Sequence, residues 1–583
     1  VYTATATLTT INLSFAVWTL IALSVVSTVF LIYLKIRLTP PKSWRVFALA
    51  ASFLTIVSAK YPSEVDVLSH WLYNALYLLD YGNLPREGLP QSFSAYTGFP
   101  YNHTFALHFV SVLTGGMAES AGYVINFGLV TLFAVLLADL IHLARTGVHN
   151  GSSSQIGWTV AALALILATY ANPIFSRKIV LMANPDTATS VVLAFLGINA
   201  WQLIERLRVK EENLKQHIIQ FSLLALLFIN LKQPNIIILA ILFLSMTLLL
   251  IDKESLKRVI RLIIFSPVLF GPALVSYLLW RGYVSSGAQL QEATLLPFEQ
   301  WQFDNIPAIL GSFWANAVKK AGYFGIMTII TIYACIRLFR LNNSFDRLAI
   351  LTAFVFIGWN GALFFLYIAH WTGHASTGAS SYWRYNTFIG YFGYAVAIYG
   401  LSRMFFERVE LTQVFLIIRG KIIQQTLVVT AIIMPFVTAP YLRFDRQQPK
   451  PYLRTIGNEI SVSVPVGSRV LVHIPGDVGD YATVMQYFAN RFRPDITVAP
   501  APSISIIRND LNKEYPSPPM VWSICRTSEL EKFFVRKLPA DKSFLLIKRQ
   551  GTWIIEKSWN WPESKLLSSY HKNIRRLRCD ITR

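Results

Sequence analysis

The sequence contains twelve apolar stretches that are long enough, or nearly so, to cross a bilayer as a helix, for which about 20 apolar residues are needed. They are 9–34, 45–60, 121–144, 156–175, 184–204, 217–232, 234–251, 259–280, 317–338, 347–369, 384–402 and 422–440. Only 14% of the 583 residues are charged, whereas soluble domains carry about a quarter. We therefore predict a polytopic α-helical, multi-pass integral membrane protein.

A further apolar stretch at 103–119 predicts a half-helix. It is interrupted by Gly115 and Gly116 and is too short to cross the membrane. Lipid offers no hydrogen bonds to a broken backbone, so such a piece has to pack against protein.

Five clusters of basic residues indicate the cytoplasmic ends of the spans, because short cytoplasmic loops are rich in Lys and Arg. Alternation of the spans then places 61–120, 176–183, 281–316, 370–383 and everything after about Tyr441 outside, together with both termini. No cleavable signal peptide is expected, since the first apolar segment lacks a charged n-region and a small-residue cleavage site. The clusters are Lys35, Arg37, Lys42 and Arg45; Arg206, Arg208 and Lys215; Lys253, Lys257, Arg258 and Arg261; Arg337, Arg340 and Arg347; and Arg403, Arg408, Arg419 and Lys421.

The net charge of +21 fits these loops and a surface that faces anionic lipid. No basic run is interleaved with aromatic residues, so nucleic acid is not an expected partner. No Gly-rich phosphate loop follows a strand, so neither a nucleotide nor another cofactor is expected. Nothing in the sequence supports a divalent metal.

From about Gln447 the pattern changes to short apolar runs separated by turn residues, which predicts a small α/β domain. The expected domains are therefore 1–446, with a first external loop at 61–120, and 447–583. Strands are expected at 468–475, 496–498, 543–547 and 552–555, and a helix at 480–491. Cys525 and Cys579 lie in this domain, where a disulfide and two unpaired thiols are both compatible with the sequence.

An acidic segment follows the second predicted span. Glu64 and Asp66 stand at the start of residues 61–82, which predict an amphipathic helix lying flat on the membrane. Asp66, His70, Tyr73 and Tyr77 lie away from its apolar face, with His70 one turn after Asp66. The two acids are either catalytic or an acidic first turn favoured by the helix dipole. The apolar face consists of Leu68, Trp71, Leu72, Ala75 and Leu79.

Two further charged residues stand at the outer ends of spans. Asp186 begins one span after Asn184 and Pro185, and Lys232 lies at the tip of a helical hairpin. A carboxylate entering an apolar helix marks a functional site unless it merely begins the helix. The lysine can bind a lipid phosphate, or it can extend to the headgroups without a specific partner.

The last candidate segment is the outer loop 370–385. His370 and His374 are four residues apart, but Gly373 argues against the helix that a zinc site would need at this spacing. Arg384, next to Tyr385, suits a phosphate or diphosphate because its guanidinium group is planar and always charged. The alternative for Arg384 is an ordinary anchor at the membrane interface.

These motifs, in this order, resemble the GT-C superfamily, whose members transfer sugars from polyprenyl-phosphate donors. The interval from Asp66 to Gly82 is 82 − 66 = 16 residues, close to the pattern of the protein O-mannosyltransferase and lipid A aminoarabinose transferase families. Residues 96–104 resemble the proline-bearing segment of those families, and 184–186 their second acidic motif. Residues 231–234 resemble their Lys-x-Pro hairpin, and Arg384–Tyr385 the pair that opens a late span.

The sequence departs from this family pattern at two positions. The first loop usually carries adjacent Asp and Glu, whereas Val65 separates the acids here, so the catalytic position is open between two residues. The aminoarabinose transferases carry a basic residue where this chain has Phe99. The phosphate would then be held by Lys232, Arg384, or Arg177 and Lys178.

The resemblance implies a GT-C-like fold and an inverting glycosyltransferase with its active site and C-terminal domain on the extracytoplasmic side of the plasma or inner membrane. Its partners would be a polyprenyl-phosphate sugar, membrane lipids, and a glycan, lipid or protein acceptor. Asp66 would be the general base, and Asp66, Asp186, Lys232 and Arg384 should converge. Glu64 and Asp186 are the other catalytic candidates, and the cavity would be lined by His70, His103, His370, His374 and Tyr385. The alternatives are a lipid or polyol transporter or flippase, and a non-catalytic membrane scaffold.

Overall fold

The computed structural model describes residues 2–33, 40–146, 156–209, 214–251, 256–286, 293–340, 343–408, 421–475, 477, 479–491, 493–513, 519–539 and 542–561. The chain forms two compact units. The membrane unit comprises Val1–Ala59, Tyr77–Gln91 and Tyr96–Leu442, and the C-terminal unit comprises Lys60–Leu76, Ser92–Ala95 and Arg443–Arg583. This division differs from the predicted one, because Glu64, Asp66 and His70 belong to the C-terminal unit.

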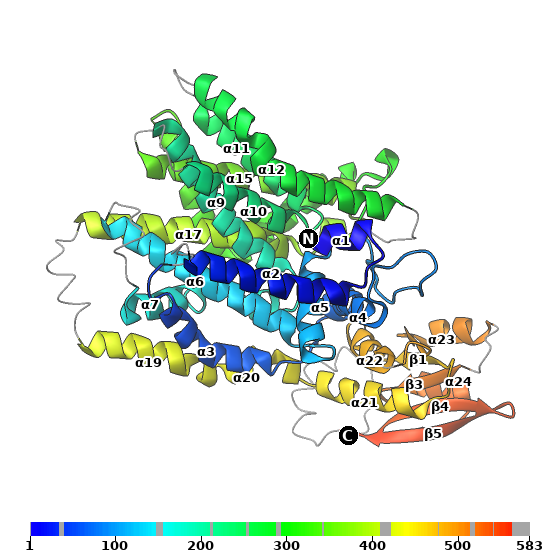
Figure 1. The fold of residues 1–583 in the computed structure, drawn as a ribbon. Helices are drawn as coiled ribbons and strands as arrows, with labels where there is room; N and C mark the ends of the chain where they lie inside the picture. The colour runs from blue at the N-terminus through cyan, green and yellow to red at the C-terminus, as the bar shows by residue number, and fades with distance from the viewer. Residues whose placement is uncertain are drawn as a thin grey trace. The chain divides into compact units, whose positions relative to one another are not determined.

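The regular elements in the described part of the membrane unit are all helices, and the long ones are labelled in Figure 1. Helix α4 (Leu72–Tyr81) crosses the division between the units. The other helices of the membrane unit are α1 (Tyr2–Leu8), α2 (Leu13–Tyr33), α3 (Trp44–Ser58), α5 (Asn102–Thr114), α6 (Ala121–Thr146), α7 (Trp158–Ala168), α8 (Arg177–Val180), α9 (Asp186–Val209), α10 (Leu214–Ile229), α11 (Asn235–Leu250), α12 (Leu256–Ser285), η2 (Phe298–Gln300), η3 (Phe303–Asn305), α13 (Ile306–Lys319), α14 (Ala321–Arg337), α15 (Ser344–Ala369), α16 (Gly373–Thr377), α17 (Tyr382–Arg408), α19 (Lys421–Val437) and α20 (Ala439–Leu442).

Each of the twelve predicted spans coincides with one of these helices, and the predicted half-helix coincides with α5, which has 13 residues. Among the described residues, five helices are long and apolar enough to cross a membrane: α2, α6, α9, α12 and α15. Six further apolar helices are shorter: α3, α7, α10, α11, α14 and α19. The chain is thus an integral membrane protein with a predominantly helical membrane part, as predicted.

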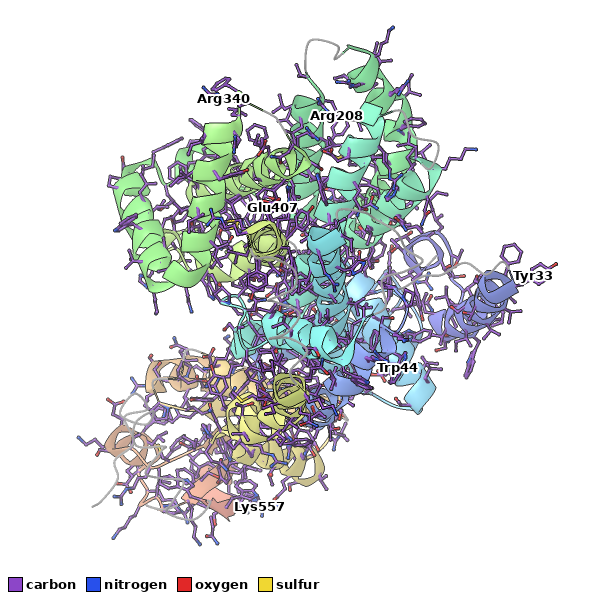
Figure 2. The ribbon with its side chains drawn as sticks, turned by 90° about the vertical axis from the view of Figure 1, so that its left-hand side faces the viewer. Tyr33, Trp44, Arg208, Arg340, Glu407 and Lys557 are labelled. Carbon is purple, nitrogen blue, oxygen red and sulfur yellow. The ribbon has the colours of Figure 1, made fainter. Side chains whose placement is uncertain are left out.

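Helices α9 and α17 form the centre of the membrane unit. Helix α9 contacts α6, α10, α11, α15 and α17, and α17 also contacts α6, α14 and α15. Figure 2, which looks along α17 near Glu407, shows helices on several sides of it. Small residues allow the close approach, because a Cβ atom on Gly197 of α9 would lie 2.5 Å from the Phe392 ring of α17. The first residues of both helices are therefore held by a packed core.

The C-terminal unit contains a five-stranded sheet in the order β2-β1-β3-β4-β5. Strand β1 pairs in parallel with β2 and β3, and β3, β4 and β5 are antiparallel. The predicted α/β domain is confirmed. The elements are η1 (Val67–Trp71), η4 (Phe444–Arg446), α21 (Lys450–Ser463), β1 (Arg469–His473), α22 (Asp480–Asn490), β2 (Thr497–Pro500), α23 (Ile504–Leu511), β3 (Met520–Ser523), α24 (Ser528–Phe534), β4 (Lys542–Arg549) and β5 (Thr552–Asn560).

Helices α23 and α24 pack on this sheet. Their side chains Ile507 and Leu530 share an apolar core with Leu471, Val521 and Phe544 of the strands. Cys525 is disulfide-bonded. Cys579, the partner considered from the sequence, lies outside the described residues, and Cys335 is a free, exposed thiol.

The acidic segment does not form the flat amphipathic helix that its sequence predicts. A π-helical turn, η1, precedes α4, and this wider turn shifts the register of the side chains. His70, Tyr73 and Tyr77, expected on the polar face, are at most 5% exposed. Tyr73 packs against Tyr487 of α22, with the ring centroids 5.3 Å apart. The helix is therefore buried on both faces, because it is part of a folded unit.

Candidate functional site

Three charged side chains of the membrane unit are in contact with one another. They come from the starts of two helices and from the turn between two others. Asp186 is the first residue of α9, Lys232 lies between α10 and α11, and Arg384 is in the first turn of α17. The Asp186 carboxylate forms an ion pair with Lys232 through Oδ1 and with Arg384 through Oδ2. We call these three residues the ion cluster. Three of the four residues expected to converge are thus in contact, while Asp66 belongs to the other unit.

The turn before α9 fixes the Asp186 carboxylate. The Asn184 side-chain amide donates a hydrogen bond to Asp186 Oδ2 at 3.0 Å, and the Asp186 backbone N–H donates to Asn184 Oδ1 at 3.3 Å. Asn184 therefore stabilises the start of α9 and also holds the carboxylate. The geometry is compatible with both roles considered for residues 184–186, the start of a helix and a functional carboxylate.

Two side chains from other helices hold this turn by its carbonyl groups. Asn126 of α6 donates to the carbonyl oxygens of Met182 at 2.6 Å and Asn184 at 2.7 Å. His103 of α5 places Nε2 3.1 Å from the Ala183 carbonyl oxygen. Burial lowers the pKa of His103 to about 4, so that the ring is neutral at physiological pH and donates from Nε2. His103, expected from the sequence to line the cavity, thus holds the turn that carries Asp186.

Lys232 is held against aromatic rings. Its Nζ atom lies 4.8 Å from the ring centroid of Phe388 and 5.9 Å from that of Tyr385, both on α17. The hairpin that carries Lys232 is fixed by Asn235, whose side chain donates to the Phe228 carbonyl at 2.8 Å. Cation–π contacts of this kind stabilise an ammonium group without adding negative charge.

Arg384 is positioned by the packing of the first turn of α17. The Trp359 indole N–H donates to the Tyr385 carbonyl at 3.0 Å, and Ser190 of α9 donates to the Thr387 carbonyl at 2.5 Å. Trp371 lies beside Tyr385, with ring centroids 5.6 Å apart. An aromatic wall thus borders the ion cluster on the side of the loop 370–385.

The three side chains of the ion cluster differ in their exposure to solvent. The Asp186 side chain is fully buried, whereas the Lys232 side chain is 11% exposed and the Arg384 side chain is 20% exposed. One carboxylate faces two cations, so the cluster carries a formal charge of +1 and its accessible atoms are the positive ones. This arrangement can bind a further anion, such as a phosphate, at the exposed edges of Lys232 and Arg384.

Other candidates from the sequence have other surroundings. Arg177 donates to the Tyr441 carbonyl and lies over its ring, 3.7 Å from the centroid, and Lys178 is exposed. His370 Nδ1 lies 2.5 Å from the Thr294 carbonyl oxygen, and His374 is exposed on α16. No group of three or more His, Cys, Asp or Glu side chains within the described ranges could hold a metal ion.

In the C-terminal unit, the two acids of the acidic segment differ in burial. Glu64 is 8% exposed and accepts hydrogen bonds from the Ser63 backbone N–H at 3.3 Å and the Ser63 hydroxyl at 3.1 Å. Asp66 is half-buried at the first turn of the helix. His70 is buried, with Nδ1 2.9 Å from the Ser69 hydroxyl. Of the two carboxylates, Asp66 is the more exposed.

Lys60, two residues past the end of α3, is another buried charge of this unit. It is 1% exposed, and its Nζ atom lies 3.4 Å from the ring centroid of Phe444. Burial lowers the pKa of Lys60 to about 8, and the attraction of Glu64 and Asp445 opposes this shift. Neither Lys60 nor Asp445 stood out in the sequence.

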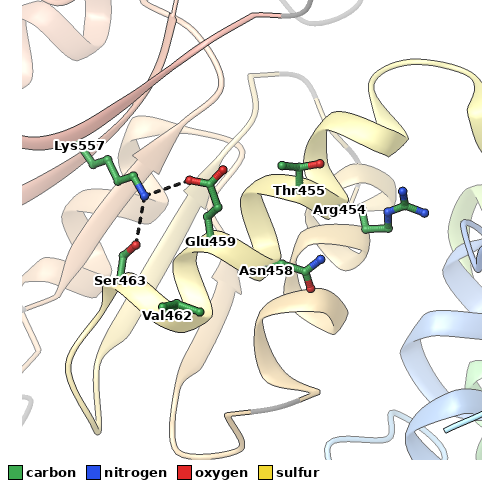
Figure 3. Close-up of a pocket in the computed structure, with 7 residues that line it drawn as sticks. All are labelled: Arg454, Thr455, Asn458, Glu459, Val462, Ser463 and Lys557. Atoms are coloured by element: carbon green, nitrogen blue, oxygen red, sulfur yellow. Dashed lines mark hydrogen bonds and ion pairs between the residues drawn. The ribbon is translucent and has the colours of Figure 1, made fainter.

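The C-terminal unit also carries a polar groove of about 460 Å³ between α21 and β5 (Figure 3). Lys557 of β5 pairs with Glu459 at 2.9 Å and donates to Ser463 at 3.3 Å. At the other end, the Arg454 guanidinium lies 3.6 Å from the ring centroid of Tyr61, near the acidic segment. The lining residues are Arg454, Thr455, Asn458, Glu459, Val462, Ser463 and Lys557. All of them except Val462 carry a hydroxyl, amide or charged group.

Fold and site together define a helical membrane protein that has a cationic cluster in its membrane unit and an acidic segment in a C-terminal α/β unit. The chain matches no protein-family model and no curated protein. Among solved structures, it is similar to ArnT from Cupriavidus metallidurans bound to undecaprenyl phosphate, with a TM-score of 0.48 and 10% identity over 88% of this chain and 97% of that one.

It is also similar to the archaeal oligosaccharyltransferase AglB from Archaeoglobus fulgidus in complex with an inhibitory peptide and a dolichol-phosphate. That match has a TM-score of 0.43 and 13% identity over 90% of this chain and 77% of that one. At TM-scores below 0.5 these similarities transfer no residue role and no activity, so the functional argument rests on the side chains of this chain.

Proposed function

We propose that the protein is a GT-C-type glycosyltransferase that moves a sugar from a polyprenyl-phosphate donor to an acceptor hydroxyl outside the membrane. The observation that carries this proposal is the ion cluster, in which Asp186 fixes two partly exposed cations among the helices of the membrane unit. Arg and Lys held in this way suit a lipid phosphate, because charge-assisted hydrogen bonds to phosphate oxygens are strong. Aromatic and apolar neighbours suit the hydrocarbon part of such a donor.

In the proposed reaction, the acceptor oxygen forms a bond to the anomeric carbon while the bond from that carbon to the phosphate oxygen breaks. Asp66 takes the proton of the acceptor hydroxyl, and the polyprenyl phosphate leaves with the bonding electron pair. Lys232 and Arg384 stabilise the negative charge that develops on the leaving phosphate. Attack opposite the leaving group inverts the configuration of the sugar. No nucleotide takes part.

The acceptor in this proposal is a glycan, lipid or protein that the C-terminal unit helps to bind. The polar groove supports this role, because it offers hydrogen-bond donors and acceptors and has the Arg454–Tyr61 contact at one end. The active site and the C-terminal unit would both be extracytoplasmic, as the positive-inside rule predicts.

Binding of undecaprenyl phosphate and dolichyl phosphate to the purified full-length protein tests the proposal. Arg384→Gln should weaken binding about 10- to 100-fold, the range expected when a charged hydrogen bond is lost, while Lys232 still neutralises Asp186. Arg403→Gln is the matched control, since Arg403 lies on the same helix in an exposed pair with Glu407 at 2.9 Å. The two arginines are 403 − 384 = 19 residues apart, about 28 Å along a helix.

Undecaprenol, which has no phosphate, separates recognition of the phosphate from recognition of the chain. Equal binding of undecaprenyl phosphate to the wild-type protein and to Arg384→Gln would show that the ion cluster is purely structural. Transfer to an acceptor in detergent identifies an enzyme. Movement of lipid that requires a sealed vesicle, without transfer, would instead favour the transporter or flippase. The absence of both activities would favour a scaffold.

A further inference from the structure

The start of the acidic segment is bound by a short stretch that lies 384 residues later in the sequence. Asp445, in η4, accepts a hydrogen bond from the backbone N–H of Tyr61 at 3.3 Å. The same carboxylate is held by Arg443, which donates from Nε at 2.9 Å and from Nη2 at 2.7 Å. Both side chains are nearly inaccessible, with exposures of 8% for Arg443 and 0% for Asp445.

Two lysines extend these contacts to Glu64. Lys60 faces the carboxylates of Glu64 and Asp445 and the cations of Arg443 and Lys450. Lys450 Nζ donates to the Ser63 hydroxyl at 3.4 Å, and that hydroxyl in turn donates to Glu64 Oε1. The group holds three cations and two carboxylates, so its net charge is +1. Glu64 is one of its counter-charges, which gives it a structural role.

The group ends where the helix that carries Asp66 begins. The first helical hydrogen bond runs from the Leu68 N–H to the Glu64 carbonyl at 3.0 Å. The position of the Glu64 backbone therefore sets the direction of the first turn, which contains Asp66. Movement of this backbone would separate the buried, hydrogen-bonded charges, and each displaced partner would leave a buried charge unpaired, which is costly.

We propose that residues 443–450 are a positioning element for the acidic segment, with Asp445 and Lys450 as its positioning residues and Asp66 as the carboxylate that they orient. The proposal rests on the proposed function for the role of Asp66. It adds a requirement for side chains at the start of the C-terminal unit that contact neither the sugar nor the phosphate.

The test compares Asp445→Asn with a matched control in the same unit, Asp495→Asn. Asp495 also lies two residues after its arginine and also accepts two hydrogen bonds from it, at 2.8 and 2.7 Å. That pair is exposed, with 26% exposure for Arg493 and 31% for Asp495, and it contacts no residue of the acidic segment among the contacts described. Both changes keep the side-chain volume and remove one charge.

Hydrogen exchange of the full-length protein is the first readout. Asp445→Asn should increase exchange of the backbone amides of 61–71 at least about tenfold, and Asp495→Asn should leave them unchanged. Turnover is the second readout, where kcat should fall about 10- to 100-fold, since a misplacement of 1 Å can cost 100-fold. Binding of undecaprenyl phosphate should stay within a factor of two.

Unchanged exchange of 61–71 together with an unchanged kcat in Asp445→Asn would overturn the proposal. Equal effects of the two Asp→Asn changes would also overturn it. If Asp445→Asn does not fold, Lys450→Met carries the test, because it keeps the Arg443–Asp445 pair and removes the Lys450 ammonium, with its hydrogen bond to Ser63 and its contact with the Phe444 ring. If the wild-type protein binds no polyprenyl phosphate, the proposed function fails, while the exchange measurement still decides whether 443–450 hold the segment.

Discussion

Asp66 and Glu64 stand two residues apart, but their surroundings separate their roles. Glu64 is buried and bonded to Ser63, whereas Asp66 is half-buried at the first turn of the helix. If Asp66 is the general base, Asp66→Asn should reduce kcat for sugar transfer about 10²- to 10⁴-fold. Binding of undecaprenyl phosphate should persist, because the amide keeps the shape of the carboxylate. Turnover and lipid binding measured on one preparation check this prediction.

Glu64→Gln is the control for that substitution. It should lower the free energy of unfolding by about 1–3 kcal/mol, because it leaves buried partners less well satisfied. Since Glu64 belongs to the charged group that positions the segment, kcat should fall too, but less than in Asp66→Asn. Loss of turnover in Glu64→Gln but not in Asp66→Asn would move the base by two residues. Full turnover in the double variant would exclude carboxylate catalysis by this segment.

Lys60 should make the stability of the protein depend on pH. Its folded-state pKa of about 8 lies below the ordinary lysine value of 10.5, so between these values the folded state has lost a proton that the unfolded state keeps. The free energy of unfolding therefore rises with pH across this window, by roughly 3 kcal/mol at most. Relative to Lys60→Met, the wild-type protein should gain thermal stability between pH 8 and pH 10. A constant difference between the two would contradict this.

The sequence predicted the charged residues of the site better than the residues that support them. Asp186, Lys232 and Arg384 stand out because charge is costly at the ends of apolar spans. Asn126, which holds two carbonyls of the turn before α9, is a single amide within the apolar stretch 121–144. An amide inside an apolar stretch indicates a hydrogen-bond partner, because burying it without one is costly. The partners of Asn126 lie 56 and 58 residues away, so the sequence pattern could not identify them.

At the level of elements, the packing of α6 against the turn before α9 gives a sharp substitution test. A Cβ atom on Gly122 would lie 2.5 Å from the Ala183 Cβ and 2.9 Å from its Cα, so Gly122→Ala must displace the turn that carries Asp186. We expect weaker binding of undecaprenyl phosphate, by about tenfold or more, and lower thermal stability. Gly128→Ala on the same helix meets no atom within 4 Å and should leave binding unchanged.

Helices were predictable wherever apolar length alone determines them, and all twelve predicted spans coincide with helices. The prediction was wrong for the face of the helix after Asp66, because the π-helical turn η1 breaks the 3.6-residue repeat on which face assignments depend. Helix α21 was missed, although Leu453, Ile456 and Ile460 carry that repeat and are buried. The exposed face of α21 is polar, so the helix is much less apolar than the spans and was not recognised.

For the molecule as a whole, the predicted sidedness can be tested with two single-cysteine variants. Val466→Cys, at a position 75% exposed in the C-terminal unit, should react with a membrane-impermeant maleimide on intact cells. Phe339→Cys, at a position 92% exposed between α14 and α15, should react only after permeabilisation. Cys335 is exposed and must first be replaced by serine. Equal labelling of both positions from outside would show that the assignment by basic clusters is wrong.

The division of the chain into units could not be predicted from local sequence. A change of composition at about residue 447 predicted the second domain, and the sheet lies where that change indicates. The acidic segment joins the same unit through contacts such as Tyr61–Asp445 and Tyr73–Tyr487. Such contacts between distant positions leave no periodic signal in either segment.

The Tyr61–Asp445 contact also has a consequence for the order of events during synthesis. A ribosome that adds about 5–20 residues per second needs roughly 20–80 s to travel the 384 residues that separate the two partners. For that time the nascent acidic segment has been made, but the residues that bind it have not. A chain interrupted before residue 443 would hold Asp186, Lys232 and Arg384 and would still lack an ordered Asp66. On the proposed function, such an unfinished chain should therefore not turn over until the C-terminal unit has been made.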